Sequence, residues 1–203
     1  MIPYNSCMKL ILDFDDVIFD NTRRFKPHMY HLLVLAGIPK AKSVRHNKLV
    51  REHQFSLKNF IADLLGSDRK KNSQLYKKAI EKCPEYVNQR LVKLVKRVGK
   101  KNCYLVTSGD WEFQHEKIRS AGVSQLFNQV LIAPESKRDL VHSICEKYSG
   151  ERVLFVDDKA RFFSGLNFRK FPNLKTLLFD KNGYRNVLRW VSGELRGKSQ
   201  SAL

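Results

Sequence analysis

The chain has 203 residues, 42% of them hydrophobic, and its 38 Lys and Arg residues against 20 Asp and Glu residues give a formal net charge of +18. This length supports one sizeable core with a modest insertion and excludes two full domains of ordinary size. No apolar run approaches the length that crosses a bilayer, so we expect no membrane-spanning segment. The positive charge favours anionic partners or substrates, with an ordinary solvated surface as the alternative.

The cysteines are few and lie far apart, without the paired spacing of a zinc site. We expect reduced, mostly buried thiols at these four positions: Cys7, Cys83, Cys103 and Cys145. The first residues lack the basic and apolar segments of a signal peptide. These features together predict a cytoplasmic protein that does not contact membranes.

The first predicted strand, residues 9–13, is an apolar run that stops in three carboxylates, Asp13, Asp15 and Asp16. In an extended chain, residues two apart share a face, so Asp13 and Asp15 are expected to point the same way and Asp16 away from them. Neighbouring carboxylates stay ionised only where a cation or strong donors hold them. The pattern predicts a metal and phosphate site, and a charged turn after an edge strand is the alternative.

A long interval without a convincing strand follows the first motif. Apolar residues at helical spacing predict three or four helices in it, followed by a core helix over residues 88–98. Between residues 22 and 86 there are fifteen Lys and Arg residues and five Asp and Glu residues, so more than half of the net charge lies here. We expect residues 21–87 to form a small helical cap and residues 1–20 and 88–203 to form the core.

Four further β-rich runs follow, at residues 102–107, 129–133, 152–157 and 175–179. Segments of helical period lie between them, at residues 111–120, 138–148 and 159–168. Asp110 and Ser136 stand where helix N-caps are expected. Strands that alternate with helices predict an α/β fold, a doubly wound, parallel, five-stranded Rossmann-like sheet that carries the small all-helical cap.

Chemically active side chains recur where these strands end. Thr107 and Ser108 end the second strand, Lys137 follows the third, and Asp157 and Asp158 end the fourth. Ligands of open parallel sheets bind outside the carboxyl ends of strands, where the strand order reverses. A metal-bound phosphoryl group needs acids for the cation, hydroxyl and amide donors for its oxygens, and a fixed positive charge. The ordered set therefore predicts phosphoryl chemistry.

This set resembles the four motifs of the haloacid dehalogenase (HAD) superfamily, which consists mainly of Mg²⁺-dependent phosphohydrolases. The helical insertion directly after the first motif is similar to the cap of that superfamily. Lys101 and Lys159 are alternative matches for the lysine motif. The matching residues are, in chain order, Asp13 and Asp15, then Thr107, then Lys137, and then the pair Asp157 and Asp158.

The resemblance implies a role for each acid. Asp13 would be the nucleophile that forms an aspartyl phosphate, and Asp15 would protonate the leaving alcohol and then deprotonate the attacking water. Members that act as dehalogenases lack an acid at the position of Asp15, so its presence favours phosphoryl transfer. Mg²⁺ would be held by Asp13, the Asp15 backbone carbonyl and Asp158, with Asp157 bound to the ion directly or just behind it.

The resemblance also implies which groups contact the substrate. Thr107, the Ser108 amide and Lys137 would hold the phosphoryl oxygens and balance their charge. Arg23 and Arg24 follow the first motif, where a cap hinge and substrate entrance would lie. These two arginines can bind the anionic remainder of a substrate, and solvent-facing charges are the alternative.

The sequence therefore predicts a Mg²⁺-dependent phosphatase that hydrolyses a small phosphorylated substrate. Two alternatives remain open at this stage. One is a phosphomutase, which shares the first half-reaction. The other is a nucleic-acid-binding or nucleic-acid-end-processing protein whose basic cap contacts phosphates.

Overall fold

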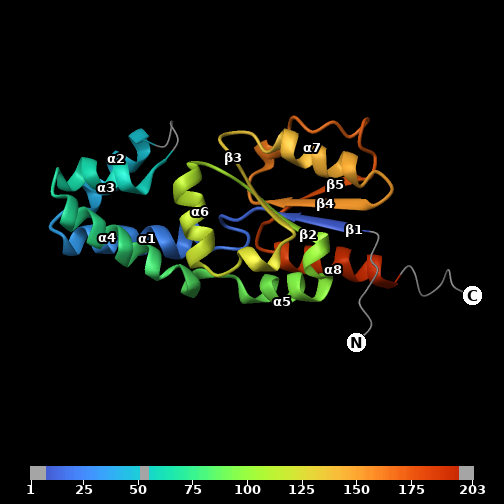
Figure 1. The fold of residues 1–203 in the computed structure, drawn as a ribbon, viewed down its shortest axis with the longest axis horizontal. Coiled ribbons are helices and arrows are strands. Elements are labelled where there is room, and N and C mark those ends of the chain that lie inside the picture. Colours follow the sequence, from blue (N-terminus) through green and yellow to red (C-terminus); the bar gives the residue numbers. More distant parts are fainter. Residues whose placement is uncertain (1–7, 51–54, 197–203) are drawn as a thin grey trace, which may run out of the picture.

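The computed structural model describes residues 8–50 and 55–196. One parallel sheet, in the strand order β3-β2-β1-β4-β5, lies at the centre of the fold (Figure 1). The strands are β1 (Met8–Leu12), β2 (Cys103–Ser108), β3 (Gln129–Ala133), β4 (Arg152–Asp157) and β5 (Leu174–Leu178). The predicted α/β class with a five-stranded parallel sheet is confirmed, and every predicted strand overlaps one of these within a residue at each end.

The central strands β1, β2 and β4 are buried on both faces because helices cover both faces of the sheet. In Figure 1, α7 (Arg138–Lys147) lies on one face, and α5 (Gln89–Val98) and α8 (Gly183–Arg196) lie on the other. Leu10 and Leu12 of β1 belong to the cluster on the α5 and α8 side, whereas Ile11 belongs to the cluster beneath α7. This alternation explains why β1 reads as a continuous apolar run rather than as an alternating one.

In its described residues, the interval between β1 and α5 consists of helices, turns and two isolated bridge pairs, Asp15–Phe19 and Phe19–Val87. Its elements are η1 (Asn21–Phe25), α1 (Lys26–Leu35), α2 (Lys40–Val50), α3 (Leu57–Leu65), α4 (Arg69–Glu81) and η2 (Cys83–Tyr86). Residues 51–54 of the expected cap lie outside the described residues. Helices α1 to α4 lie to one side of the sheet, and α6 (Trp111–Ser120) lies between them and the strands (Figure 1).

Ion pairs and hydrogen bonds join α6 to the helices of the insertion. Lys58 Nζ of α3 lies 2.6 Å from Glu112 Oε1 and 3.8 Å from Glu116 Oε1. The Tyr76 hydroxyl of α4 also donates a hydrogen bond to Glu116. Because α6 packs on the sheet as well, it links the insertion to the core, together with the bridge between Phe19 and Val87.

The prediction of a helix over residues 159–168 is wrong. The structure has only a short turn there, η5 (Ala160–Phe162), followed by further turns. Phe163 and Leu166 pack against the cluster under α7, but Ser164 and Gly165 lie between them. The Ser164 hydroxyl donates to the Arg161 carbonyl at 2.8 Å, a local bond that competes with helix propagation.

The two predicted N-caps have different outcomes. Asp110 caps α6 by accepting a hydrogen bond from the Phe113 amide at 2.8 Å. Ser136 does not cap α7, because the N-cap position is Lys137, whose side chain makes no capping bond. The Ser136 hydroxyl instead accepts a bond from the Arg138 amide at 3.2 Å. The Lys137 side chain instead contacts acids at the carboxyl edge of the sheet.

The three cysteines within the described residues, Cys83, Cys103 and Cys145, are buried and form no disulfide. Burial raises the pKa of the Cys83 and Cys103 thiols to about 12, so both stay protonated. The predicted buried thiols are therefore found at these positions, and Cys7 lies outside the described residues. Within residues 8–50 and 55–196, no helix is long and apolar enough to cross a bilayer.

Candidate active site

Two acids meet where β1 and β4 end side by side. Asp13 follows β1 directly, and its amide donates to the Val156 carbonyl of β4 at 2.9 Å. Asp157 is the last residue of β4, and the two acids are 2% and 0% exposed. The strand order reverses between β1 and β4, which is where ligands of such sheets bind. The expected position of the site is therefore occupied by two buried carboxylates.

A buried lysine lies between these carboxylates. Lys137 Nζ is 2.8 Å from Asp13 Oδ1 and 2.6 Å from Asp157 Oδ2, and the lysine is 1% exposed. Burial alone would lower the pKa of Lys137, but the two acids hold it above its usual value, so the ammonium stays charged. Of the three lysines that could match the motif, Lys137 is thus the one that contacts Asp13. Lys101 belongs to η3 (Lys100–Asn102), which precedes β2.

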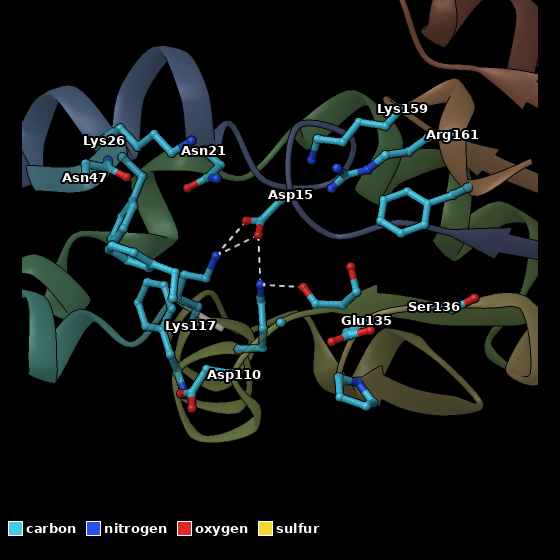
Figure 2. A pocket seen from close by; sticks show the side chains of 18 of the residues that line it. Asp15, Asn21, Lys26, Asn47, Asp110, Lys117, Glu135, Ser136, Lys159 and Arg161 are labelled. Carbon is cyan, nitrogen blue, oxygen red and sulfur yellow. Dashed lines mark hydrogen bonds and ion pairs between the residues drawn. The ribbon is translucent and has the colours of Figure 1, made fainter. Parts of the chain in front are cut away.

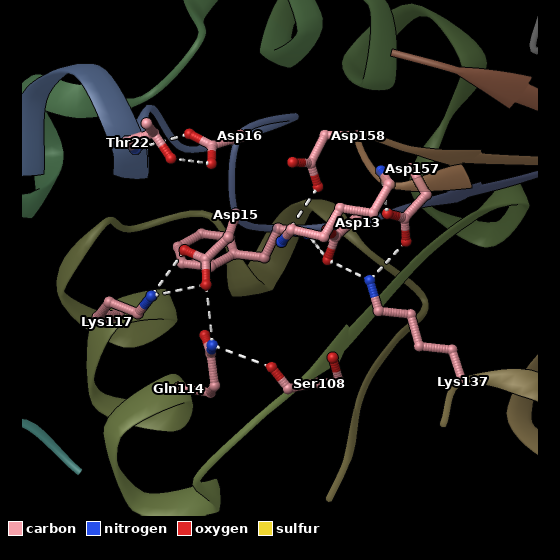
Figure 3. Close-up of polar contacts among 12 residues, drawn as sticks. Asp13, Asp15, Asp16, Thr22, Ser108, Gln114, Lys117, Lys137, Asp157 and Asp158 are labelled. Carbon is pink, nitrogen blue, oxygen red and sulfur yellow. Dashed lines mark hydrogen bonds and ion pairs between the residues drawn. The ribbon is translucent and has the colours of Figure 1, made fainter. Parts of the chain in front are cut away.

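A third acid completes a group that could hold a metal ion. Carboxylate oxygens of Asp13, Asp157 and Asp158 all lie within 4.8 Å of one another (Figure 3). Asp158 Oδ1 is buried and accepts no hydrogen bond, although Lys159 Nζ lies 3.5 Å from it. An acceptor without a donor beside two further acids has the chemistry of a hard-cation site. The three acids therefore fit Mg²⁺.

The charges in this group are poorly balanced without a cation. Burial, reinforced by Asp157 and only partly offset by Lys137, raises the pKa of Asp13 from its usual 3.8 to about 7. Burial also raises the pKa of Asp158, an effect that Lys159 partly offsets. A divalent cation would stabilise the ionised form of both acids.

Asp15 has a different set of partners. Lys117 Nζ lies 2.6 Å from its Oδ1 and 2.9 Å from its Oδ2, and Gln114 Nε2 donates to Oδ2 at 2.9 Å (Figure 3). Burial alone would raise the pKa of Asp15, but Lys117 and Gln114 together hold it below its usual value. Asp15 is therefore held ionised.

Asp13 and Asp15 do not share a strand face as expected, because β1 ends at Leu12. The chain turns after Asp13, and the amides of Ile18 and Phe19 both donate to the Phe14 carbonyl.

Asp16 is separate from the other acids, as expected. Its φ of 61° places it in the left-handed region. Its carboxylate accepts hydrogen bonds from the Thr22 amide at 2.7 Å and from the Thr22 hydroxyl at 2.5 Å. Asp16 thereby fixes the start of the insertion relative to the first motif, which is a structural task.

The end of β2 lies at the same edge of the sheet. Thr107 is buried, and the Ser108 carbonyl accepts a bond from Gln114 Nε2 at 3.2 Å. Gly109 follows with a φ of 137°, and a Cβ there would meet Gln114 Nε2 at 3.2 Å. The glycine therefore allows the sharp passage from β2 into α6 and the close approach of Gln114.

A cleft of about 970 Å³ opens beside this edge (Figure 2). Asp15 and Ser108 line it, together with residues of the insertion and of the segment after β4. The expected substrate contacts Arg23 and Arg24 do not line it. Arg24 lies over the Tyr86 ring instead, with its guanidinium carbon 4.9 Å from the ring centroid. The cations that line the cleft are Lys26, Lys117, Arg138, Lys159 and Arg161.

The contacts of Gln114 and Lys117 with Asp15 were not predicted from the sequence. They lie three residues apart on the buried face of α6, with Phe113. Helical spacing predicts that they share this face. The partner of that face is 99 to 102 residues away in sequence, so no local pattern identifies Asp15 as the acceptor.

No family model and no curated protein matches this sequence. Solved structures do match. A protein described as a haloacid dehalogenase-like hydrolase from Burkholderia xenovorans has a TM-score of 0.66 at 17% identity, covering 87% of this chain and 84% of its own. One described as a β-phosphoglucomutase from Thermotoga maritima has a TM-score of 0.54 at 16% identity, covering 91% and 99%.

A magnesium-bound protein from Bacillus subtilis, described as a HAD-hydrolase, has a TM-score of 0.52 at 17% identity, covering 85% of this chain and 86% of its own. At such identities the likeness establishes a shared fold and leaves the chemistry to be argued from the site.

Proposed function

We propose that this chain, whose fold is that of the haloacid dehalogenase-like hydrolases, is a Mg²⁺-dependent phosphatase of small phosphomonoesters with Asp13 as its nucleophile. The observation that carries the proposal is the group of buried Asp13 and Asp157 with half-buried Asp158, and with Lys137 between the two buried acids. Acids for a cation and a fixed ammonium beside a nucleophilic carboxylate are what phosphoryl transfer requires.

Mg²⁺ would be held by the carboxylates of Asp13 and Asp158, with Asp157 beside them and the Asp15 carbonyl as a further ligand. When bound, the cation supplies positive charge that allows an anionic nucleophile to approach an anionic phosphoryl group. Lys137 contributes to the same balance from the side of β4 and α7, and Thr107 and the Ser108 amide are donors for the phosphoryl oxygens.

In the first half-reaction, a carboxylate oxygen of Asp13 attacks phosphorus while the bond from phosphorus to the ester oxygen breaks. The leaving oxygen takes a proton from Asp15, and the products are an alcohol and an aspartyl phosphate. Lys117 and Gln114 favour the ionised form of Asp15. The proton therefore comes from a minor protonated fraction, and esters of poor leaving groups are expected to react slowly in this step.

In the second half-reaction, ionised Asp15 takes a proton from water as the water oxygen attacks phosphorus. The bond from phosphorus to Asp13 breaks, orthophosphate leaves, and the Asp13 carboxylate is restored. The contacts of Asp15 with Lys117 and Gln114 support this step, because they keep Asp15 in the base form.

The test is orthophosphate release by the purified full-length chain from p-nitrophenyl phosphate and a panel of phosphorylated metabolites, with Mg²⁺ or with a chelator. We expect Mg²⁺-dependent turnover that Asp13→Asn lowers by roughly three orders of magnitude or more. Asp180→Asn changes an exposed acid that follows β5 outside the cleft and is the matched control.

Two results would contradict the proposal. The first is full turnover by Asp13→Asn, and the second is no turnover of any panel member with Mg²⁺. Transfer of the phosphoryl group to a second position on a sugar, without orthophosphate, would identify a phosphomutase instead.

A further inference from the structure

Three cations line the core side of the cleft, and we call them the cationic wall: Arg138, Lys159 and Arg161. Arg138 is the first residue of α7, and the other two follow the acidic pair at the end of β4. Figure 2 shows Lys159 and Arg161 side by side, with their charged ends directed towards the cleft near Asp15.

One member of the cationic wall is bonded through its backbone to the candidate metal site. The Lys159 amide donates to Asp157 Oδ1 at 2.9 Å. The Phe162 ring lies near both Lys137 and Arg161. Lys137 Nζ is 4.3 Å from the ring centroid, and the Arg161 guanidinium carbon is 5.0 Å from it. Arg161 and the lysine that pairs with Asp13 therefore lie against the same ring.

Arg161 differs from its neighbours in having no acidic partner. Arg138 pairs with Asp139 at 2.8 Å, and Lys159 lies 3.5 Å from Asp158. Within residues 8–50 and 55–196, Arg161 contacts the Phe162 ring and forms no ion pair. An exposed guanidinium stacked on an aromatic ring presents its planar donor fork to solvent, a geometry that suits carboxylate or phosphate.

The cleft is also larger than a phosphoryl group needs. Its volume of about 970 Å³ is at the upper end of pockets that hold drug-sized molecules. The side opposite the cationic wall comes from the insertion and combines apolar Met29 and Phe55 with the amides of Asn21 and Asn47. An organic body can thus contact the insertion while a charged group faces the core.

We propose that the substrate carries a second anionic group, a carboxylate or a phosphate, and that Arg161 binds it as a bidentate partner with Lys159 adding positive charge. This inference rests on the proposed phosphatase activity and names the class of its substrate. The second anion can belong to a small metabolite or to the next phosphodiester of an oligonucleotide, because both present the same oxygens to a guanidinium.

The test compares kcat/KM within pairs of phosphomonoesters that differ in a second anion, with Mg²⁺ present. The pairs are glycerol phosphate against phosphoglycerate, and a nucleoside 5′-monophosphate against the 3′,5′-bisphosphate. A 5′-phosphorylated oligonucleotide forms the third arm. We expect at least one doubly anionic substrate to be preferred by about 10- to 100-fold, the range for a charged hydrogen-bonded pair.

Variants assign that preference to Arg161. Arg161→Gln should remove most of it, mainly through KM, and Arg161→Lys should keep part of it because the charge remains while the fork is lost. Arg169→Gln removes an exposed cation of the same segment that does not line the cleft, and it should keep the full preference.

The outcomes separate this inference from the function beneath it. The inference is overturned if turnover shows no preference for a second anion, or if Arg161→Gln leaves that preference intact. The proposed phosphatase activity is then still supported. No turnover of any ester overturns the proposed function and the inference with it. A preference confined to the oligonucleotide supports the inference and identifies a nucleic-acid end as the source of the anion.

Discussion

Asp13 must be ionised to act as a nucleophile, but its burial favours the protonated form. In the folded protein without a metal ion its pKa is about 7, whereas in an unfolded chain an aspartate loses its proton near pH 3.9. The stability that this raised pKa contributes is fully present below the unfolded pKa and is lost as the pH rises through about 7. A cation that binds the ionised carboxylate offsets this loss.

We therefore expect Mg²⁺ to raise the thermal unfolding midpoint more at pH 8 than at pH 5, because protons compete with the metal at pH 5. At a hundredfold excess over Kd, binding stabilises a protein by about 2.7 kcal/mol. Midpoints recorded with and without Mg²⁺ at both pH values measure the effect. Asp158→Asn should remove most of it and Asp180→Asn should not. Equal shifts at pH 5 and pH 8 would argue against a metal site at these acids.

Lys117 is a buried charge whose environment offers two kinds of stabilisation. It is 1% exposed and pairs with Asp15. Its ammonium lies 4.7 to 5.7 Å from four aromatic ring centroids, those of Phe14, Phe19, Phe25 and Phe113. Cation–π attraction and the ion pair together offset part of the cost of burying the charge.

Lys117→Met is expected to lower the free energy of unfolding by about 3–5 kcal/mol, because it leaves the mostly buried Asp15 carboxylate without its cation. Urea unfolding measures the loss. Lys58→Met is the control, since Lys58 pairs with Glu112 at the surface and should cost about 1 kcal/mol or less. If the two variants lose the same stability, Asp15 does not depend on Lys117.

Among the elements, α6 contributes most to the organisation of the site. Its N-cap Asp110 follows the turn after β2, its buried face carries Gln114 and Lys117, and Glu112 and Glu116 bind the insertion. A change at the start of this helix should therefore affect both stability and turnover.

Asp110→Ala should cost about 1 kcal/mol through loss of the cap, and it should also lower turnover because the first turn of α6 supports Gln114. Asp68→Ala provides a matched control. Asp68 caps α4 by accepting from the Lys71 amide at 3.0 Å, away from the cleft. Urea unfolding and steady-state kinetics should show similar stability losses and a fall in turnover for Asp110→Ala alone. Equal turnover in both variants would contradict this role of α6.

Local patterns predicted the elements that leave a regular apolar signal in the sequence. The bounds of β3, β4 and α6 match the predicted ranges, because β3 and β4 are short apolar runs and α6 is an amphipathic helix. The segment over residues 159–168 has apolar residues at helical spacing, but its side chains pack from a series of turns. Helix α8 was not predicted at all, although Val187 and Val191 pack into the core.

For the whole molecule, the sequence was enough to predict which strand-end residues meet at the carboxyl edge of the sheet. It was not enough to predict the contacts that other elements make there. Chain order and strand ends were enough to bring Asp13, Lys137 and Asp157 together, since parallel strands end at one edge. The contact of Lys117 with Asp15 and the position of Arg161 depend on how α6 and the loop after β4 pack in three dimensions. The turn after Asp13 likewise overrode the two-residue period assumed for the first motif.

The most direct test of the account is to identify the atom that receives the phosphoryl group. Turnover mixtures with Mg²⁺ and a hydrolysed ester are quenched in acid, which preserves acyl phosphates, and the peptides are sequenced by mass spectrometry. We expect a phosphoryl group on Asp13 in the wild-type chain and none in Asp13→Asn. Product formation with no phosphoryl group on Asp13, or with the group on another residue, would contradict it.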